Sequence, residues 1–169
     1  MTTVAATGPA QRAVHSLRLS RSATRKLLAG IPADKRCAQP GGCVNHALWV
    51  AGHLACTDDY FLNKFGGAPF ALPQEWHTLF GMGSKPVSDA SAYPAYDAVL
   101  TAMEARREAL IAWFQGRSGA ELETAAPEGW KDYAPTVEDV AHFASWHESY
   151  HGGQLSVLRK SLGLANAFS

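Results

Sequence analysis

Apolar residues recur along this chain at spacings of three and four, which is typical of amphipathic helices, and no segment shows the alternation of a strand. Four stretches carry the pattern strongly enough to predict long helices. They run from about Pro9 to Ala29, from about Val44 to Phe65, from near Pro94 to Gly116, and from Thr136 to about Leu162. We therefore expect an all-α protein.

Residues at the ends of these stretches support the boundaries. Gly30 and Pro32 follow the first stretch, where they stop a helix, and Pro94 suits the first turn of the third helix. Thr136 is a favourable N-cap for the fourth helix, and the carboxylates of Glu138 and Asp139 suit the positive end of its dipole. Capping chemistry and periodicity thus predict the same helices.

The connection between the second and third predicted helices is long, about residues 66–93, and contains Pro69, Pro73 and Pro86. A link of this length usually has a structural or functional role. We expect a crossover that contains a short helix near Gln74–Phe80. The predicted architecture is a four-helix bundle with a long crossover between helices 2 and 3, built as a single domain over residues 1–169.

Composition and charge narrow the classes of partner. The sequence is 47% hydrophobic and 18% charged, as expected for a folded globular protein. Fifteen basic and fifteen acidic residues give a formal net charge of zero, so the chain offers no phosphate-neutralising surface. No apolar run is long enough to cross a bilayer. The sequence therefore predicts neither a nucleic-acid partner nor a membrane partner.

The N-terminus and the cysteines bear on the cellular compartment. Residues Met1 to Ala10 have neither the basic start nor the apolar stretch of a secretion signal. Cys37, Cys43 and Cys56 are an odd count, and their spacing does not form a C-x-x-C pair. These features predict reduced thiols and a cytoplasmic location.

The clearest chemical signal is an H-E-x-x-H motif formed by His147, Glu148 and His151 in the fourth predicted helix. On a helix the two histidines lie about 40° apart and about 6 Å along the axis, so both can reach one metal ion. The same motif marks zinc proteases, which need a third ligand downstream. Residues 152–169 contain no His, Asp or Glu. The sequence therefore argues against a zincin protease.

A third ligand has to come from upstream, and His53 in the second predicted helix is the best candidate. Bundle helices pack about 8–10 Å apart, so imidazoles from two helices can meet between them. Taken alone, His53 is better explained as a core histidine that is satisfied by one hydrogen bond, and only the need for a ligand facing the fourth helix favours the metal site. The remaining histidines fit a shared site less well; they are His15, His46, His77 and His142. His77, in the crossover, could overhang the site, but we expect it to face solvent.

Three glycines adjoin the candidate ligands. Each costs about 0.8–1.0 kcal/mol relative to alanine inside a helix, so each calls for a packing or functional reason. Either close packing of helices or space for a small molecule above the metal explains them; they are Gly52, Gly152 and Gly153.

The residues around these histidines resemble those of a known family. The stretch from His147 to Leu155, followed by Leu158-Arg159 and Gly163, is similar to the last helix of the DinB/YfiT-like proteins, the metal-binding four-helix bundles of the DinB superfamily. The segment from Asn45 to Leu54, with Trp49 four residues before His53, resembles the second helix of that family. The order of elements is similar too, so the resemblance covers nearly the whole chain.

The resemblance implies a Zn²⁺ or Ni²⁺ ion held by His53, His147 and His151, with water completing the coordination shell. Family members include bacterial thiol S-transferases, a mycothiol-dependent maleylpyruvate isomerase and proposed metal-dependent hydrolases. The resemblance thus implies a small-molecule substrate, with a low-molecular-weight thiol as the first candidate.

Three functional hypotheses follow. The first is an enzyme whose metal activates a small thiol for transfer or isomerisation. The second is a metal-dependent hydrolase in which Glu148 acts as the catalytic general base on metal-activated water, although Glu148 is equally compatible with a solvated carboxylate. The third is a non-enzymatic metal-binding or stress-response bundle, acting as a homodimer.

Further residues are candidates for the surroundings of the metal. Cys56 lies one turn beyond His53, where it could line a pocket or become a fourth ligand, although simple buried packing is favoured. Three aromatic residues could form the wall of the pocket or belong to the core: Trp49, Trp146 and Tyr150.

Overall fold

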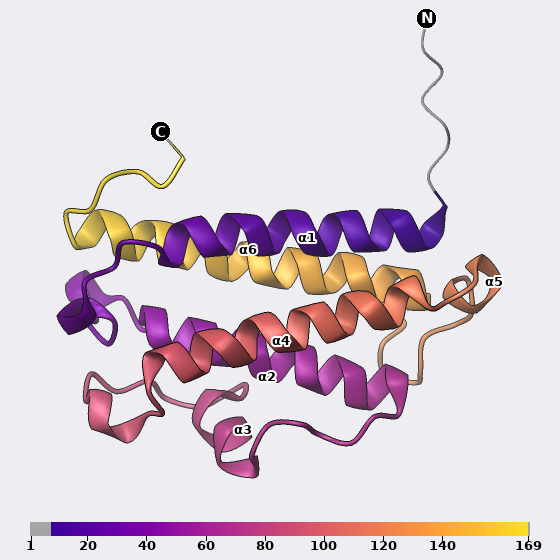
Figure 1. Ribbon diagram of the computed structural model, residues 1–169, viewed down its shortest axis with the longest axis horizontal. Helices are drawn as coiled ribbons and strands as arrows, with labels where there is room; N and C mark the ends of the chain where they lie inside the picture. The colour runs from indigo at the N-terminus through magenta and orange to yellow at the C-terminus, as the bar shows by residue number, and fades with distance from the viewer. Residues whose placement is uncertain (1–7, 169) are drawn as a thin grey trace, which may run out of the picture.

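The computed structural model describes residues 8–168, and four long helices form its body (Figure 1). They are α1 (Pro9–Leu28), α2 (Ala47–Gly66), α4 (Tyr96–Gln115) and α6 (Val137–Ser161). Between residues 8 and 168 there is no strand, and one isolated antiparallel bridge joins Ala125 to Thr136. The predicted all-α helical bundle is confirmed.

Shorter helices lie in the connections. The segment between α2 and α4 contains α3 (Gln74–Phe80), the short helix expected there, and a 3₁₀ helix η3 (Ala90–Ala92). The link from α1 to α2 contains η1 (Ala33–Lys35) and η2 (Pro40–Gly42), and α5 (Gly119–Leu122) follows α4. Most of the Met1–Ala10 segment, considered above as a secretion signal, lies outside the described residues.

N-capping hydrogen bonds determine where two of the long helices begin. Thr136 caps α6 as predicted, because its hydroxyl accepts a hydrogen bond from the backbone N–H of Asp139. The second helix begins at Ala47 and not near Val44, because His46 is its N-cap. The Nδ1 atom of His46 accepts the N–H of Trp49 at 3.1 Å. A histidine in this role is not among the favoured N-cap residues, which explains the misplaced start.

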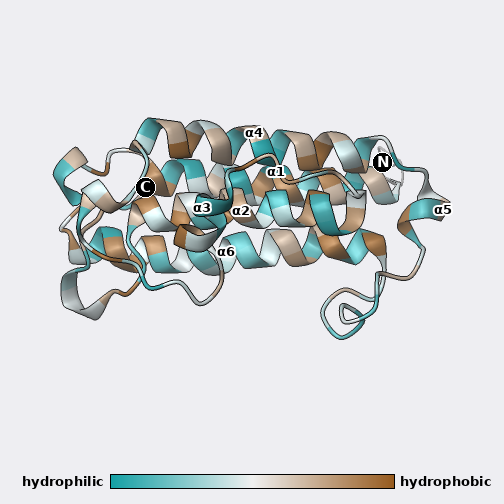
Figure 2. Ribbon diagram, turned by 90° about the horizontal axis from the view of Figure 1, so that it is seen from below, coloured by the Kyte–Doolittle hydropathy of each residue, from teal (hydrophilic) through white to brown (hydrophobic). Residues whose placement is uncertain are grey.

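The four long helices pack as two parallel pairs. In Figure 1, α1 and α6 run in one direction, and α2 and α4 run in the opposite direction. α1 packs mainly against α6, and α2 packs mainly against α4, whereas α2 and α6 make less extensive contact. Each long helix carries alternating apolar and polar bands (Figure 2). The less extensive contact between α2 and α6 leaves room for the site described below.

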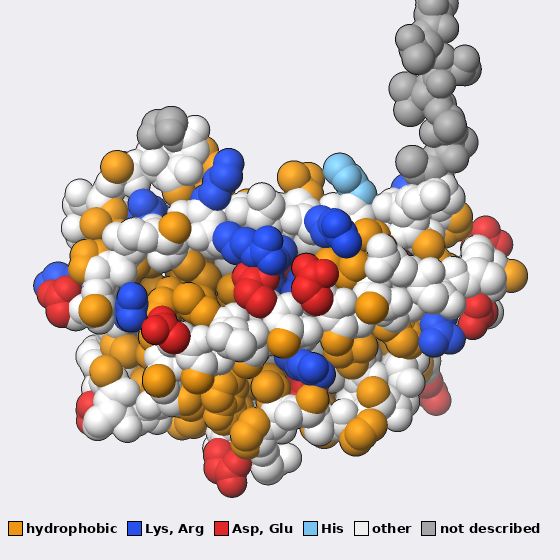
Figure 3. Space-filling model, viewed as in Figure 1, with side chains coloured by type: hydrophobic (Ala, Val, Ile, Leu, Met, Phe, Trp, Pro, Cys, Tyr) orange, Lys and Arg blue, Asp and Glu red, His pale blue; other side chains and the backbone are white. Residues whose placement is uncertain are grey.

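The apolar core is divided into two clusters, one toward each end of the bundle. One includes Leu54 and Leu155, and the other includes Phe61 and Phe114. Between them, each long helix contributes a buried charged side chain: Arg21, Asp58, Arg107 and Glu148, which we call the ion quartet. On the outer face formed by α1 and α4, charged side chains gather beside apolar hollows (Figure 3). The polar middle layer is therefore shared by all four long helices.

None of the described helices has both the length and the apolar character required to cross a membrane.

Candidate metal centre

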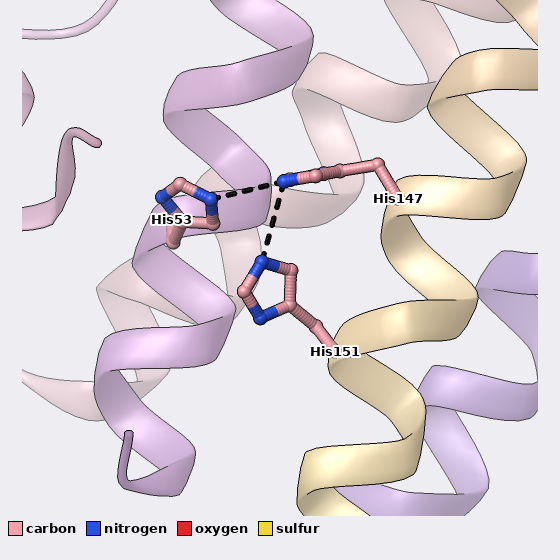
Figure 4. Close-up of side chains that lie close together, drawn as sticks. All are labelled: His53, His147 and His151. Atoms are coloured by element: carbon pink, nitrogen blue, oxygen red, sulfur yellow. Dashed lines mark hydrogen bonds between the residues drawn. The ribbon is translucent and has the colours of Figure 1, made fainter. Parts of the chain in front are cut away.

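Three histidine side chains meet between α2 and α6 in the middle layer of the bundle (Figure 4). His53 comes from α2, and His147 and His151 come from successive turns of α6. The Nε2 atom of His147 lies 3.2 Å from Nε2 of His53 and 3.3 Å from Nε2 of His151. The structure thus brings together the three residues that the sequence singled out as candidate ligands.

Hydrogen bonds outside the cluster fix two of the three tautomers. The Nδ1 atom of His53 lies 2.7 Å from the carbonyl oxygen of Phe80, which can only accept, so Nδ1 carries the proton. The Nδ1 atom of His151 donates to Oε1 of Gln154 at 2.9 Å, and the side chain of Asn45 donates to the same oxygen. The Nε2 atoms of neutral His53 and His151 therefore present lone pairs to the cluster.

The surroundings keep the imidazoles neutral. Burial and the neighbouring His151 lower the pKa of His53 to about 4. Burial, together with His151 and His53, lowers the pKa of His147 to about 3. Burial also lowers the pKa of His151. Neutral imidazole is the form that binds a metal ion.

The cluster cannot satisfy its own hydrogen bonds. His147 can donate one proton from Nε2, and that proton serves at most one of the two lone pairs facing it. Its Nδ1 atom is buried and has no hydrogen-bond partner. A divalent cation would satisfy all three Nε2 lone pairs at once. In a tetrahedral site with bonds of about 2.0–2.1 Å, two nitrogen ligands lie roughly 3.3–3.4 Å apart, close to the separations observed here.

A cavity of about 540 Å³ opens onto the three histidines. Trp49 stacks on His53, with ring centroids 4.6 Å apart and an interplanar angle of 9°. Phe143 stacks on His147, with ring centroids 6.4 Å apart and an interplanar angle of 15°. Trp130, from the segment before α6, lines the cavity and contacts Phe143. The candidate metal site therefore has an open side, and aromatic rings continue from its ligands into the cavity.

Glu148 lies away from the cavity. Its side chain is fully buried, and its two oxygens lie 2.8 Å from Nε of Arg21 and 2.8 Å from Nη2 of Arg107. The interpretation as a solvated carboxylate is wrong, because no part of the residue reaches solvent. The general-base hypothesis gains no support from this position, since both oxygens are engaged by guanidinium groups within the ion quartet.

Some of the other candidate residues line the cavity, and others lie outside it. Cys56 lines the cavity but is not part of the three-ligand group, and burial raises the pKa of its thiol to about 12. Trp49 also lines the cavity, as the sequence allowed. Trp146 and Tyr150 are more than half exposed and do not line it.

His77 was expected to face solvent, and that expectation is wrong. It lines the cavity, and its Nε2 atom lies 3.2 Å from Oδ2 of the buried Asp59. The sequence could not indicate this contact, because it joins α3 to a carboxylate on α2 through tertiary packing. Asp59 also accepts the backbone N–H groups of Ala71 and Leu72, so it holds the chain ahead of α3 against α2.

The three glycines near the ligands have different surroundings. A Cβ atom on Gly52 would lie 2.4 Å from the ring of Phe80, so this glycine permits the close packing that brings the Phe80 carbonyl to His53. A Cβ on Gly152 would meet Leu27 at an ordinary 3.4 Å, and none of the described neighbours approaches that of Gly153 within 4 Å. Only the first of the three therefore requires glycine for close packing.

Comparison with known proteins agrees with this geometry. Residues 16–155 match the family model described as the DinB superfamily, and the matched range includes all three histidines. No curated protein matches the chain.

Proposed function

The chain belongs to the DinB superfamily, and we propose that His53, His147 and His151 hold a Zn²⁺ or Ni²⁺ ion that activates a small thiol. The observation that carries the proposal is the convergence of three imidazole Nε2 atoms, two of them from buried histidines and one from a half-buried histidine, beside an open cavity. Three protein ligands and a free position are the pattern of catalytic metal sites, whereas structural sites use four protein ligands.

When bound, a divalent ion in such a site lowers the pKa of a thiol or water that coordinates to it. The protein contributes the positions of the ligands. The Phe80 carbonyl and the Gln154 amide oxygen hold His53 and His151 in the tautomer that offers Nε2, and aromatic side chains line the cavity on the ligand face. These contacts prepare the site before a substrate arrives.

The position of Glu148 favours thiol activation over hydrolysis. A thiol has an unperturbed pKa of about 8.5, whereas that of water is about 15.7, so a thiol needs less help to lose its proton. The hydrolase alternative assigns the base to Glu148, which is engaged with Arg21 and Arg107. A hydrolase that uses a protein base would have His77 in the cavity lining instead.

Two measurements test the proposal. Elemental analysis should find about one divalent metal per chain in the native protein and a loss of that metal in His53→Ala. His142→Ala is the control, because His142 is an exposed histidine on the same helix as two of the ligands. Full metal content in His53→Ala would overturn the proposed site.

The metal-loaded protein should also accelerate conjugation of cysteine or glutathione to 1-chloro-2,4-dinitrobenzene. Turnover of ester or amide substrates without thiol would support the hydrolase. Metal binding that changes stability or self-association without any turnover would support a non-enzymatic bundle, including the homodimer expected under that hypothesis.

A further inference from the structure

We propose that the cavity above the three histidines selects an uncharged, ring-bearing molecule, which is the electrophilic partner of the thiol. This inference rests on the proposed function and specifies the chemical class of one substrate. It is carried by the side chains that line the cavity and by the manner in which nearby charges are paired.

The lining is largely aromatic and lacks the side chains that carry a fixed charge. Among the residues 8–168 that the structure describes, none of those lining the cavity is Lys, Arg, Asp or Glu. A connected aromatic wall is formed by Phe61, Trp130 and Phe143. The ring centroid of Trp130 lies 5.7 Å from that of Phe61 and 5.4 Å from that of Phe143. Such a wall favours flat apolar groups through offset and edge-to-face contacts.

Two carboxylates lie close to this lining, and neither is available to a ligand. Asp59 is 1% exposed and is engaged by His77, by Arg106 and by backbone N–H groups of the segment before α3. Glu148 is fully buried between Arg21 and Arg107. A charged group on the part of a ligand that lies away from the metal would therefore lose hydration in the cavity without gaining a counter-charge from the protein.

The opposite face of the bundle provides a contrast. A hollow of about 590 Å³ between α1 and α4 is lined by Arg25, Arg36, Asp97 and Glu104 together with apolar residues. In Figure 3 charged groups border apolar hollows on this face. The hollow between α1 and α4 thus has charged side chains in its lining, whereas the cavity that contains the three histidines has a similar volume and an uncharged aromatic wall.

The size of the cavity fits a small molecule with one or two rings. A volume of about 540 Å³ lies within the range of about 300–1,000 Å³ that is usual for small-molecule sites. Since common low-molecular-weight thiols carry charged groups, the body of such a thiol would lie outward while its sulfur reaches the ligand face. The apolar electrophile would then pack against the aromatic wall.

A ligand series tests the proposal on the zinc-loaded native protein. Acetohydroxamate, benzohydroxamate and 2-naphthohydroxamate share a metal-binding group and differ in apolar body. Burying an aromatic ring should tighten binding by at least about 10-fold between the first and the last. 4-Carboxybenzohydroxamate should bind at least about 10-fold more weakly than the uncharged 4-carbamoylbenzohydroxamate, which has nearly the same shape. Calorimetry measures each dissociation constant.

Variants locate the effect. Trp130→Ala should remove most of the preference for the naphthyl compound, whereas Trp146→Ala, an exposed tryptophan outside the lining, should keep it. Equal affinities along the series, or equal binding of the carboxylate and the carboxamide, would overturn the proposal. Because the series uses the native protein, it remains decisive even if Trp130→Ala does not fold.

A parallel series separates this proposal from the proposed function. Acetamide, benzamide and 2-naphthamide lack the metal-binding group, and their binding is followed through tryptophan fluorescence. If hydroxamates bind no better than the matched amides, the metal centre is overturned while a ranking by apolar body still supports the cavity. If hydroxamates gain affinity and the ranking is absent, the metal centre stands and the cavity proposal fails.

Discussion

The three-histidine cluster and the ion quartet occupy the same middle layer of the bundle, the cluster between α2 and α6 and the quartet among all four long helices. In the quartet, Arg107 pairs with Asp58 at 2.8 Å and with Glu148 at 2.8 Å, and Arg21 also contacts both carboxylates. Two positive and two negative groups balance within the protein. In the histidine cluster, lone pairs face one another, and the Nδ1 atom of His147 has no partner.

The difference indicates how to separate structural from functional polar clusters. A buried polar group is tolerated when it is paired, and it is costly when it is not. The quartet is complete without any ligand, so its role is to join the four helices. The histidine cluster is incomplete, so it calls for a cation. The H-E-x-x-H motif contains one part of each cluster, since Glu148 belongs to the quartet and its flanking histidines belong to the site.

The largest expected effect comes from breaking the quartet. Glu148→Gln leaves two buried guanidinium groups with one carboxylate, and we expect a loss of about 3–5 kcal/mol in the free energy of unfolding. Urea denaturation of the metal-free protein measures this loss.

The matched control for Glu148→Gln is Glu104→Gln, which removes the α4 partner of an ion pair at the surface between α1 and α4. If Glu148→Gln retained native stability but lost turnover in the metal-loaded protein, Glu148 would belong with the catalytic site, and the comparison between the two clusters would fail.

The second effect concerns metal stabilisation. Zinc at 100 times its dissociation constant should stabilise the native protein by about 2.7 kcal/mol, and His147→Ala should abolish that gain. Without metal, the variant should be nearly as stable as the native protein, because the substitution removes an unpaired buried nitrogen.

Thermal unfolding with and without zinc gives both quantities for His147→Ala. His15→Ala serves as the control, since His15 is exposed on α1. A large loss of stability in the metal-free variant would show that the cluster, like the quartet, is internally satisfied.

The third effect is a dependence on pH that comes from a buried histidine with complete hydrogen bonding. His46 is fully buried, its Nδ1 accepts the N–H of Trp49, and its Nε2 bonds the carbonyl of Val87. Burial lowers its pKa to about 4. Since the unfolded pKa is about 6.5, the unfolded chain binds more protons between these values, and stability falls as the pH falls.

We expect His46 to account for a loss of about 2 kcal/mol between pH 7 and pH 5. The metal ligands titrate in the same direction, so the effect is measured as the difference between the native protein and His46→Asn, which keeps an N-cap acceptor and does not titrate. Identical pH profiles for the two proteins would contradict the assignment.

The sequence predicted the ligands more readily than the quartet, and the reason is geometric. His147 and His151 follow from helical spacing, and His53 follows from an imidazole in an apolar helix. Glu148 required its partners Arg21 and Arg107, which lie 127 and 41 positions away along the chain. Such contacts depend on how the helices pack, which periodicity does not specify.

A signal for the quartet was nevertheless present in the sequence. Glu148 lies seven residues from Ala141 and from Leu155, so it falls within the apolar stripe that α6 buries. Arg107 likewise lies four residues from both Met103 and Ile111. A charged residue within a core stripe indicates a buried ion pair, because an unpaired charge would be too costly there. The same reasoning could not find His77, since α3 has only seven residues and one buried position.

The smallest expected effect comes from breaking an arginine–glutamate ion pair at the surface, which has the same chemistry as the pairs in the quartet. Arg25 and Glu104 pair across α1 and α4, with about half of the Arg25 side chain exposed to solvent. Water already solvates both groups, so Glu104→Gln should cost less than about 1 kcal/mol. Raising the salt concentration from 0.05 to 1 M, roughly a threefold or greater reduction of the Debye length, should reduce that cost further, whereas the cost of Glu148→Gln should change little. Urea denaturation at both salt concentrations checks this contrast. Similar costs and similar salt dependence for the two substitutions would mean that burial does not distinguish the quartet from an ordinary surface pair.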